Sequence, residues 1–292
     1  MFDQADPLRN LVRTTVQAHP ALRPGVPLVV LTGGPSVVGT STVALQLTRE
    51  LAQLGKRAVL VDADLVQTKL TRQLGVARSG CLADVLAGNR SAVEVLAPVC
   101  DQVCLLPGRW DPSAPPELHR LALQRFFSEV RNLHSRADVV VLDAGEGMSP
   151  WVQQMWQAAQ QILMITSTDS KEVTETYAMI KLAPRDDVDG KLRLVVTGAE
   201  DRAGAERVGV NFAATCRQFL GVKIGPHVTL ARSTAPDSAN ASTRRVSDDR
   251  AFTQSVRSLA ADLMSHCLVL ADSASQRADI RGAANLGGFV EK

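Results

Sequence analysis

Short apolar runs bounded by turn residues alternate with longer helical patterns along most of this chain. The first run is Leu28-Val29-Val30-Leu31-Thr32, a helical pattern follows from Thr42 to Leu54, and a second run ends at Asp62. Similar runs occupy residues 103–106, 139–143, 162–165 and 192–196. Continuous apolar strands are typical of a parallel sheet that is covered on both faces. The pattern predicts an α/β, doubly wound, mostly parallel sheet with helices on both faces, within a domain of residues 28–267.

Other stretches lie outside this rhythm. Residues 1–19 predict an N-terminal arm, in which Leu8, Leu11, Val12 and Val16 have helical spacing. A proline-rich linker (20–27) follows. Residues 232–250 predict a polar loop before a final helix, whose apolar positions are Phe252, Val256, Leu259, Leu263 and Cys267. Residues 268–292 are small and polar and predict a flexible tail.

Composition narrows the function classes. Lys plus Arg (32) nearly balance Asp plus Glu (30), which argues against a protein that binds nucleic acid through bulk charge. The five cysteines form an odd set without C-x-x-C spacing, so we expect a reducing, cytoplasmic location. Because no apolar run approaches the roughly 20 residues of a membrane span, we expect membrane contact to be peripheral at most.

A glycine-framed turn joins the first strand to its helix. Gly34-Pro35-Ser36-Val37-Val38-Gly39-Thr40-Ser41 keeps the frame G-x-x-x-x-G-x-S of a phosphate-binding P-loop. In such loops the backbone N–H groups cradle phosphate, a Lys reaches the phosphate oxygens and a Ser or Thr hydroxyl binds Mg²⁺. Here Thr40 stands where that Lys belongs. Asp62, Asp64 and Asp143 end later strands and are the carboxylates that such sites place around Mg²⁺ and water.

These residues resemble the MinD/ParA branch of P-loop NTPases, whose loop reads K-G-G-x-G-K-[ST] and whose second strand ends in V-D-A-D, as residues 61–64 do. The resemblance implies the doubly wound fold and an ATP-dependent face-to-face homodimer. It also implies Ser41 as a magnesium ligand, Asp64 as a first-switch carboxylate that is catalytic if the enzyme is active, and Asp143 as the later-strand carboxylate.

The loop departs from the family motif at four positions. Pro35 and Thr40 replace the two lysines, and Ser36 and Val37 replace the two glycines. Val37 would be strained if its position keeps a positive φ. Each lost charge-assisted contact costs about 1.5–3 kcal/mol. Further along, Thr197 stands where the family has a base-reading Asn.

Two interpretations of these departures remain open. One is a scaffold with weakened or lost ATP hydrolysis. The other is an active ATPase switch in which Lys69 or Lys171 replaces the missing lysines. Both interpretations leave open whether the site binds ATP or ADP with Mg²⁺.

Within this branch, the chain resembles the FlhG family. Residues 174–181 resemble its T-[DE]-x-Y-A-x-I-K helix, and residues 217–221 its R-x-F-L-G segment. Asp3-Gln4-Ala5-Asp6-Pro7-Leu8-Arg9 matches its N-terminal activator motif D-Q-A-x-x-L-R. In that family the arm docks on the signal-recognition-particle-type GTPase FlhF and stimulates GTP hydrolysis.

The arm has the chemistry for that role. A Gln side chain can donate to and accept from an attacking water, so Gln4 is the expected activating residue. Leu8 would anchor a helix in an apolar groove, and Arg9 would contact its rim. Asp3 and Ala5 complete the motif. The alternative is an amphipathic helix that covers the domain's own surface, with Gln4 in solvent.

The sequence therefore predicts a FlhG-like regulator of flagellar number and placement that activates FlhF. Flagellar basal-body or chemotaxis components are further expected partners, and such partners could recruit it to the cell pole or inner membrane. The alternatives are an ATP-dependent dimerising switch and a ParA-like DNA-binding module that uses Arg232, Arg244, Arg245 and Arg250. Parts of the chain also resemble bacterial tyrosine kinases of polysaccharide export, but Tyr177 is its single tyrosine and lies mid-chain.

Two further pairs have more than one interpretation. Trp151 and Trp156 follow the helix start Ser149-Pro150, and they lie either at a partner surface or in the core. Cys100 and Cys104 lack partner histidines at metal spacing, so we expect a packed or incidental pair rather than a zinc site.

Overall fold

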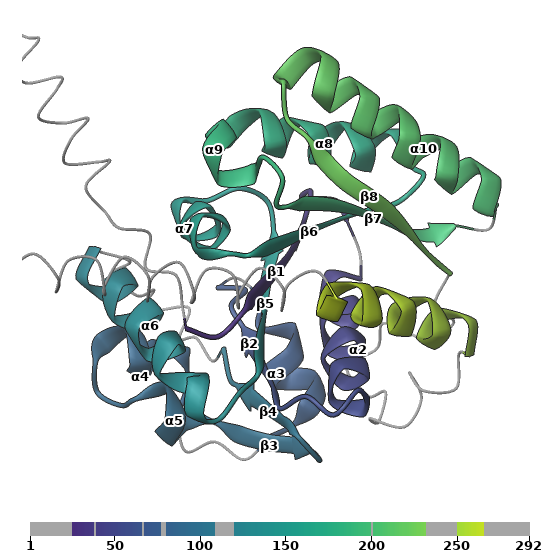
Figure 1. The fold of residues 1–292 in the computed structure, drawn as a ribbon. Helices are drawn as coiled ribbons and strands as arrows, with labels where there is room; N and C mark the ends of the chain where they lie inside the picture. Colours follow the sequence, from purple (N-terminus) through teal and green to yellow (C-terminus); the bar gives the residue numbers. More distant parts are fainter. Residues whose placement is uncertain are drawn as a thin grey trace, which may run out of the picture.

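The computed structural model describes residues 25–37, 39–65, 67–76, 80–108, 120–199, 201–231 and 250–265. Within these ranges eight strands form one sheet, in the spatial order β3-β4-β2-β5-β1-β6-β7-β8 (Figure 1). The strands are β1 (Leu28–Gly33), β2 (Ala58–Asp62), β3 (Ala97–Cys100), β4 (Val103–Leu106), β5 (Val139–Glu146), β6 (Gln161–Thr166), β7 (Leu192–Ala199) and β8 (Ile224–Ala231). All neighbouring strands are parallel except β3 and β4. The predicted mostly parallel sheet is confirmed.

The sequence pattern did not reveal the two edge strands, β3 and β8. β3 contains Pro98, which a sheet tolerates at its edge because proline has no N–H to donate. β8 contains Gly225 and Pro226, and most of its residues are only half-buried. Since neither edge strand is a continuous apolar run, the rule that found the central strands does not apply to them.

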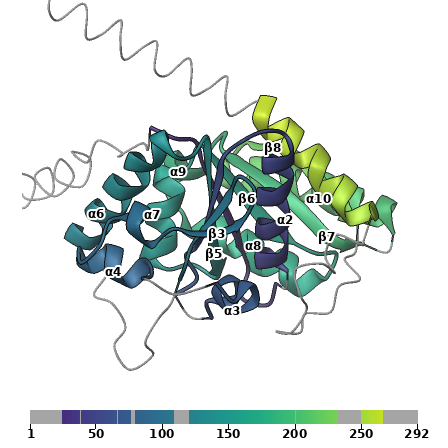
Figure 2. The same cartoon turned by 90° about the horizontal axis from the view of Figure 1, so that it is seen from below.

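Helices cover both faces of the sheet. They are α2 (Thr40–Gln53), α3 (Lys69–Leu74), α4 (Leu82–Ala87), α5 (Ala92–Val95), α6 (Arg120–Asn132), α7 (Pro150–Ala158), α8 (Ser170–Leu182), α9 (Arg185–Val188), α10 (Arg202–Thr215) and a C-terminal helix over residues 250–265. A 3₁₀ turn (Leu133–Ser135) follows α6, and a π-helical turn (Cys216–Leu220) follows α10. Figures 1 and 2 show α2 beside the C-terminal helix on one face, with α6, α7 and α8 on the other.

Successive strand residues enter two separate apolar clusters. In β1, Leu28 and Val30 pack toward the cluster that contains α6 and α7. Val29 and Leu31 pack toward the cluster that contains α2 and the C-terminal helix. All six residues of β1 are buried. Because both faces of the central strands are covered, these strands are apolar throughout rather than alternating.

Two ion pairs, each with one buried partner, join the C-terminal helix to the rest of the domain. Arg257 Nε donates to Glu50 Oε2 of α2 at 2.7 Å, and the Glu50 side chain is fully buried. Arg193 of β7 donates to Asp262 at 3.2 Å. The predicted final helix is confirmed over the described residues 250–265, and Cys267 lies outside them.

The tryptophan pair belongs to the core. Trp151 and Trp156 are 2% and 0% exposed. The Trp151 ring packs edge-on against Phe126 at 5.0 Å, and its Nε1–H donates to the Ala63 carbonyl at 2.9 Å. Helix α7 begins as predicted, with the Ser149 hydroxyl accepting from Val152 N–H and Pro150 in the first turn. This helix is thereby tied to the residue that follows β2.

Several predicted segments lie outside the described residues: the arm (1–19), most of the linker, the loop residues 232–249 and the tail (268–292). Within the described ranges, no helix combines the length and apolar character needed to cross a membrane.

Candidate nucleotide-binding site

The candidate site lies where the carboxyl ends of β1, β2 and β5 meet. β5 pairs with both β1 and β2, and Asp62 is in register with Asp143. The P-loop leaves β1 at this edge and leads into α2. This is the edge at which open parallel sheets bind ligands, and the sequence placed its acidic candidates there.

The P-loop retains the backbone turn that opens a helix toward a ligand. Gly39 has φ +102° and caps α2, and its carbonyl accepts from Val43 N–H at 2.9 Å. No side chain caps the first turn of α2. Its N–H groups and the positive end of its dipole therefore remain directed at the loop.

The loop carries no cation at the motif positions. Pro35 is exposed, and Thr40 is 4% exposed. The Thr40 hydroxyl has no hydrogen-bond partner among the described residues. It lies near Gly33, where an added Cβ would come within 3.2 Å of its oxygen. An unpaired buried hydroxyl beside a helix N-terminus is a group that a ligand could satisfy.

Asp62 is held by helix α3. Its Oδ2 atom accepts from the backbone N–H of Thr71 at 2.8 Å and from the Thr71 hydroxyl at 2.6 Å. The same hydroxyl accepts from Gly108 N–H at 2.8 Å. Burial raises the pKa of Asp62 to about 6, against the lowering effect of the Thr71 hydrogen bonds. One oxygen of the Asp62 carboxylate therefore holds the start of α3 and, through Thr71, the residues after β4.

Asp143 is fully buried beside the loop. Burial raises its pKa to about 7, the charges of Asp62 and Asp64 add to the rise, and hydrogen bonds from the Ser41 hydroxyl and Gly145 N–H oppose it. The Oδ2 atom of Asp143 and the Oδ1 atom of Asp62 have no hydrogen bond of good geometry within the described residues. The Ser41 hydroxyl and two incompletely satisfied carboxylates thus lie together.

Asp64 is engaged with its own loop. Its Oδ1 atom accepts from Gln67 N–H at 3.0 Å, and its side chain is almost fully buried. It also lies over Gly145, where an added Cβ would come within 2.6 Å of the carboxyl carbon. Gly145, at φ +69°, is the residue type that this close approach and backbone require.

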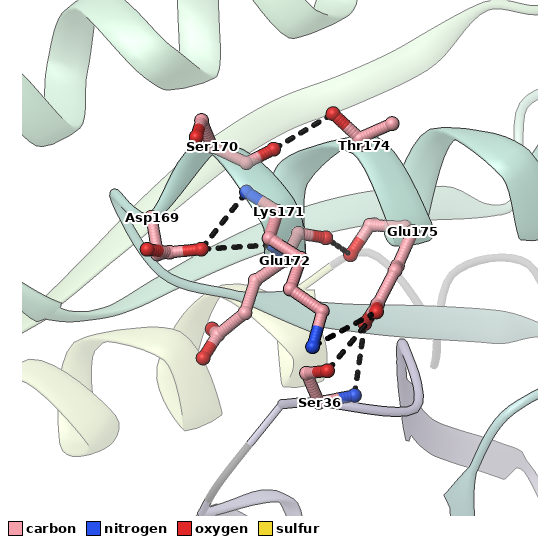
Figure 3. A network of polar contacts seen from close by, with 8 residues as sticks. Ser36, Asp169, Ser170, Lys171, Glu172, Thr174 and Glu175 are labelled. Carbon is pink, nitrogen blue, oxygen red and sulfur yellow. Dashed lines mark hydrogen bonds and ion pairs between the residues drawn. The ribbon is translucent and has the colours of Figure 1, made fainter.

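Both lysines that the sequence offered as replacements are paired with acids. Lys69, the first residue of α3, donates to Glu146 at the end of β5 at 2.9 Å. Lys171 lies 3.8 Å from Glu175 on α8. Glu175 in turn accepts from the Ser36 N–H at 2.9 Å and from the Ser36 hydroxyl at 3.0 Å (Figure 3). An acidic side chain therefore binds the phosphate loop.

Comparison with known proteins identifies relatives of this arrangement. A family model described as adenylylsulphate kinase matches residues 26–93, which hold β1, the loop and β2. The chain is 27% identical over 199 residues to the antiactivator FleN of Pseudomonas aeruginosa, covering 68% of this chain and 71% of FleN. It is 26% identical over 183 residues to the flagellum site-determining protein YlxH of Helicobacter pylori, covering 62% of each chain. It thus spans less than two thirds of YlxH.

The solved structures agree with these relatives. The cell division ATPase MinD of Pyrococcus furiosus superposes with a TM-score of 0.65 at 16% identity, over 82% of this chain and 98% of that one. The chain thus has the fold of the MinD/ParA branch of the P-loop NTPases, and its sequence is similar to those of FleN and YlxH. The putative tyrosine-protein kinase EpsB of Ralstonia solanacearum is 32% identical over 176 residues, but the match covers only 23% of EpsB.

Compared with the MinD/ParA loop motif, the Val37 substitution is accommodated without strain, contrary to the expectation from sequence. Among the described non-glycine residues only Thr68 and Gln102 have a positive φ. Val37 is 1% exposed and packs with the α2 face of the core, and its N–H donates to the Gly34 carbonyl at 3.0 Å. Among the described residues of the loop, Gly39 alone has a positive φ, so a β-branched residue fits at position 37.

The donors present fit the Mg²⁺ that this branch implies. Within the described residues, no three His, Cys, Asp or Glu side chains form a ready-made metal cage. Mg²⁺ usually takes one or two carboxylates together with waters and nucleotide phosphates. The Ser41 hydroxyl and the buried Asp143 carboxylate match that demand. When bound, the ion would neutralise phosphate charge.

Thr197, which replaces the base-reading Asn of the branch, is engaged within the sheet. Its hydroxyl donates to the Thr166 carbonyl at 3.1 Å and so links the ends of β7 and β6.

Sequence reasoning missed four residues of the site: Thr71, Gly108, Glu146 and Glu175. Glu175 lies in the FlhG-like stretch 174–181, but that resemblance said nothing of a contact with the loop. The other predicted site residues, Asp3, Gln4, Ala5, Leu8 and Arg9, lie outside the described residues. So do Arg232, Arg244 and Arg245. All described cysteines are unbridged, and on the paired strands β3 and β4 Cys100 is exposed while Cys104 is half-buried.

Proposed function

We propose that this chain is a FlhG-like regulator of flagellar number and placement, whose N-terminal arm stimulates the GTPase of the partner FlhF. The arm is carried on a MinD-type domain with weakened or lost nucleotide hydrolysis. Similarity to FleN and YlxH supports the flagellar role, and the match of residues 3–9 to the activator motif supports the arm. Recruitment to the pole or inner membrane would then follow from partners.

The observation that carries the proposal is a phosphate loop without a cation at either motif position. The loop keeps its helix-opening turn at Gly39, yet both lysine positions are filled by Pro35 and Thr40. The two nearby lysines are each paired with an acid, Lys69 with Glu146 at 2.9 Å and Lys171 with Glu175 at 3.8 Å. Phosphoryl transfer depends on positive charge placed around the transferred phosphate. A domain built in this way is better suited to positioning an arm than to turnover.

In the proposal, catalysis takes place on the partner. The Gln4 side chain orients the water that attacks GTP, because an amide can both accept from and donate to it. Leu8 anchors the arm helix in an apolar groove of FlhF, and Arg9 contacts the rim of that groove.

The test is GTP turnover by FlhF with the full chain added. Wild type should raise the rate, Gln4→Ala should lose most of the rise, and Gln17→Ala, the same change later in the arm, should keep it. Equal stimulation by wild type and Gln4→Ala would refute the assigned role of Gln4. No stimulation by the folded wild-type chain would refute the activator role.

A second function, an ATP-dependent dimerising switch, is favoured by one feature of the site. The Ser41 hydroxyl and the buried Asp143 carboxylate lie together as a magnesium site would require. The switch predicts ATP hydrolysis that Asp64→Ala abolishes, and dimerisation on adding MgATP. Sizing columns with and without MgATP, together with phosphate release, separate it from the first proposal.

A further inference from the structure

The contact between Glu175 and the phosphate loop plays no part in the function proposed above. Glu175, on the second turn of α8, holds Ser36 through both carboxylate oxygens (Figure 3). The two segments are packed closely, because a Cβ added at Gly34 would lie 2.9 Å from Glu175 Cβ and 3.4 Å from Thr176 N. The carboxylate is therefore fixed against the loop rather than passing near it.

The Ser36 N–H is one of the loop donors that a P-loop offers to phosphate. A carboxylate is also an anion, and a backbone N–H that donates to it is no longer available to a phosphate oxygen. The same carboxylate lies 3.8 Å from Lys171 Nζ, whose side chain is 72% exposed. Glu175 thus occupies a loop donor and offsets the nearest mobile positive charge on α8.

We propose that Glu175 competes with a nucleotide phosphate for the Ser36 N–H, and that the phosphate takes Lys171 as its cation once Glu175 is displaced. This rests on the part of the proposed function in which the loop still accepts a nucleotide. Lys171 then supplies, from outside the loop, the charge that Thr40 does not. The ligand class is a magnesium-bound nucleoside di- or triphosphate.

The geometry makes the exchange chemically balanced. Displacing Glu175 breaks two hydrogen bonds to Ser36, and a phosphate oxygen can accept from both of the same donors. Lys171 exchanges one anionic partner for another, and the Glu175 carboxylate, whose side chain is already 23% exposed, must turn to water for its hydrogen bonds. While Glu175 is bonded to Ser36, a bound phosphate and the Glu175 carboxylate would repel each other, because both are anions and both would be partly buried beside the loop.

The experiment measures binding of a fluorescent ATP analogue, with Mg²⁺, to the full-length chain. Glu175→Gln removes the charge and keeps the size. It should tighten binding about tenfold or more, since one charge-assisted contact is exchanged. Glu172→Gln makes the same charge change on the same helix, at a side chain that Figure 3 shows without a contact to Ser36. It should leave affinity within about twofold.

Two further arms identify the groups involved. Lys171→Met in the Glu175→Gln background should weaken binding about tenfold, because the cation is then missing. Inorganic pyrophosphate, which has neither base nor ribose, should compete better in Glu175→Gln than in wild type. Should Glu175→Gln fold poorly by thermal melting, Glu175→Asp, which shortens the reach to Ser36, should also tighten binding.

Equal affinity of wild type and a folded Glu175→Gln would overturn the proposal, as would an equal gain in Glu172→Gln. Binding to neither wild type nor the Glu175 variants would also overturn it. GTP turnover by FlhF would still report on the activator role independently. Binding that appears only when Glu175 is changed would support the competition directly.

Discussion

The raised pKa of Asp143 makes a prediction about stability. Its folded-state pKa, about 7, lies above the ordinary value of 3.8, because the buried carboxylate is desolvated. Between these values Asp143 binds more protons in the folded chain than in the unfolded chain, so its contribution to stability falls as pH rises from near 4 to near 7. A shift of this size corresponds to about 4 kcal/mol. The charged form of Asp143 is thus held at the expense of folding stability.

Asp143→Asn removes that charge and keeps an oxygen that can accept from Ser41. It should raise the free energy of unfolding by about 1–3 kcal/mol near pH 8, because the unpaired amide N–H offsets part of the gain. The gain should vanish near pH 4, where the aspartate is protonated. Urea unfolding followed by circular dichroism, without Mg²⁺, measures it, and Asp101→Asn at an exposed carboxylate is the control. A gain of Asp143→Asn over wild type that does not grow between pH 4 and pH 8, or a variant less stable than wild type near pH 8, would refute the reasoning.

Three further changes test the packing around the site. Arg257→Ala should destabilise the chain by about 2–3 kcal/mol, because it leaves the fully buried Glu50 without its ion pair, and Glu50→Gln with Arg257→Met should recover much of this in urea unfolding. Gly108→Ala should lower the melting temperature strongly, since its Cβ would lie 2.1 Å from the Asp62 carbonyl oxygen, whereas Gly25→Ala, with no atom closer than 3.8 Å, should lower it little. Thiol reagents should label the exposed Cys100 in the native chain, a signal that Cys100→Ser removes. They should reach Cys216 only on unfolding, because burial raises the pKa of its thiol to about 11; labelling of native Cys216 would contradict that packing.

The central sheet could be predicted from the sequence because its strands are buried on both faces. Runs such as residues 139–143 are apolar without interruption, and the carboxyl ends of parallel strands lie on one edge. The sequence pattern therefore predicted that Asp62 and Asp143 lie together. The edge strands lack this signal, since β8 is half-exposed and contains Gly225 and Pro226.

The contact between Glu175 and the P-loop could not be predicted in the same way. Ser36 and Glu175 are 139 positions apart, and they meet because Gly34 allows α8 to approach the loop. Nothing in the local pattern of α8 marks which acid points toward the loop. The strain expected at Val37 is absent for a related reason: a motif with several glycines does not indicate which of them needs a positive φ. In the part of the loop that the structure describes, only Gly39 does so.

The V-D-A-D match is weak evidence for ATP hydrolysis, because both of its aspartates make hydrogen bonds that stabilise the fold of this chain. Asp62 joins α3 to the end of β4 through Thr71 and Gly108, and Asp64 orders its own loop through Gln67. Replacing either would disturb the fold whether or not ATP is turned over. A loss of activity in Asp64→Ala therefore points to catalysis only when urea unfolding shows the variant as stable as wild type. Asp143 differs, because the charged form of its buried carboxylate opposes folding. Residues with pKa values perturbed in this way cluster at functional sites, so Asp143 is the better candidate for a ligand-binding role.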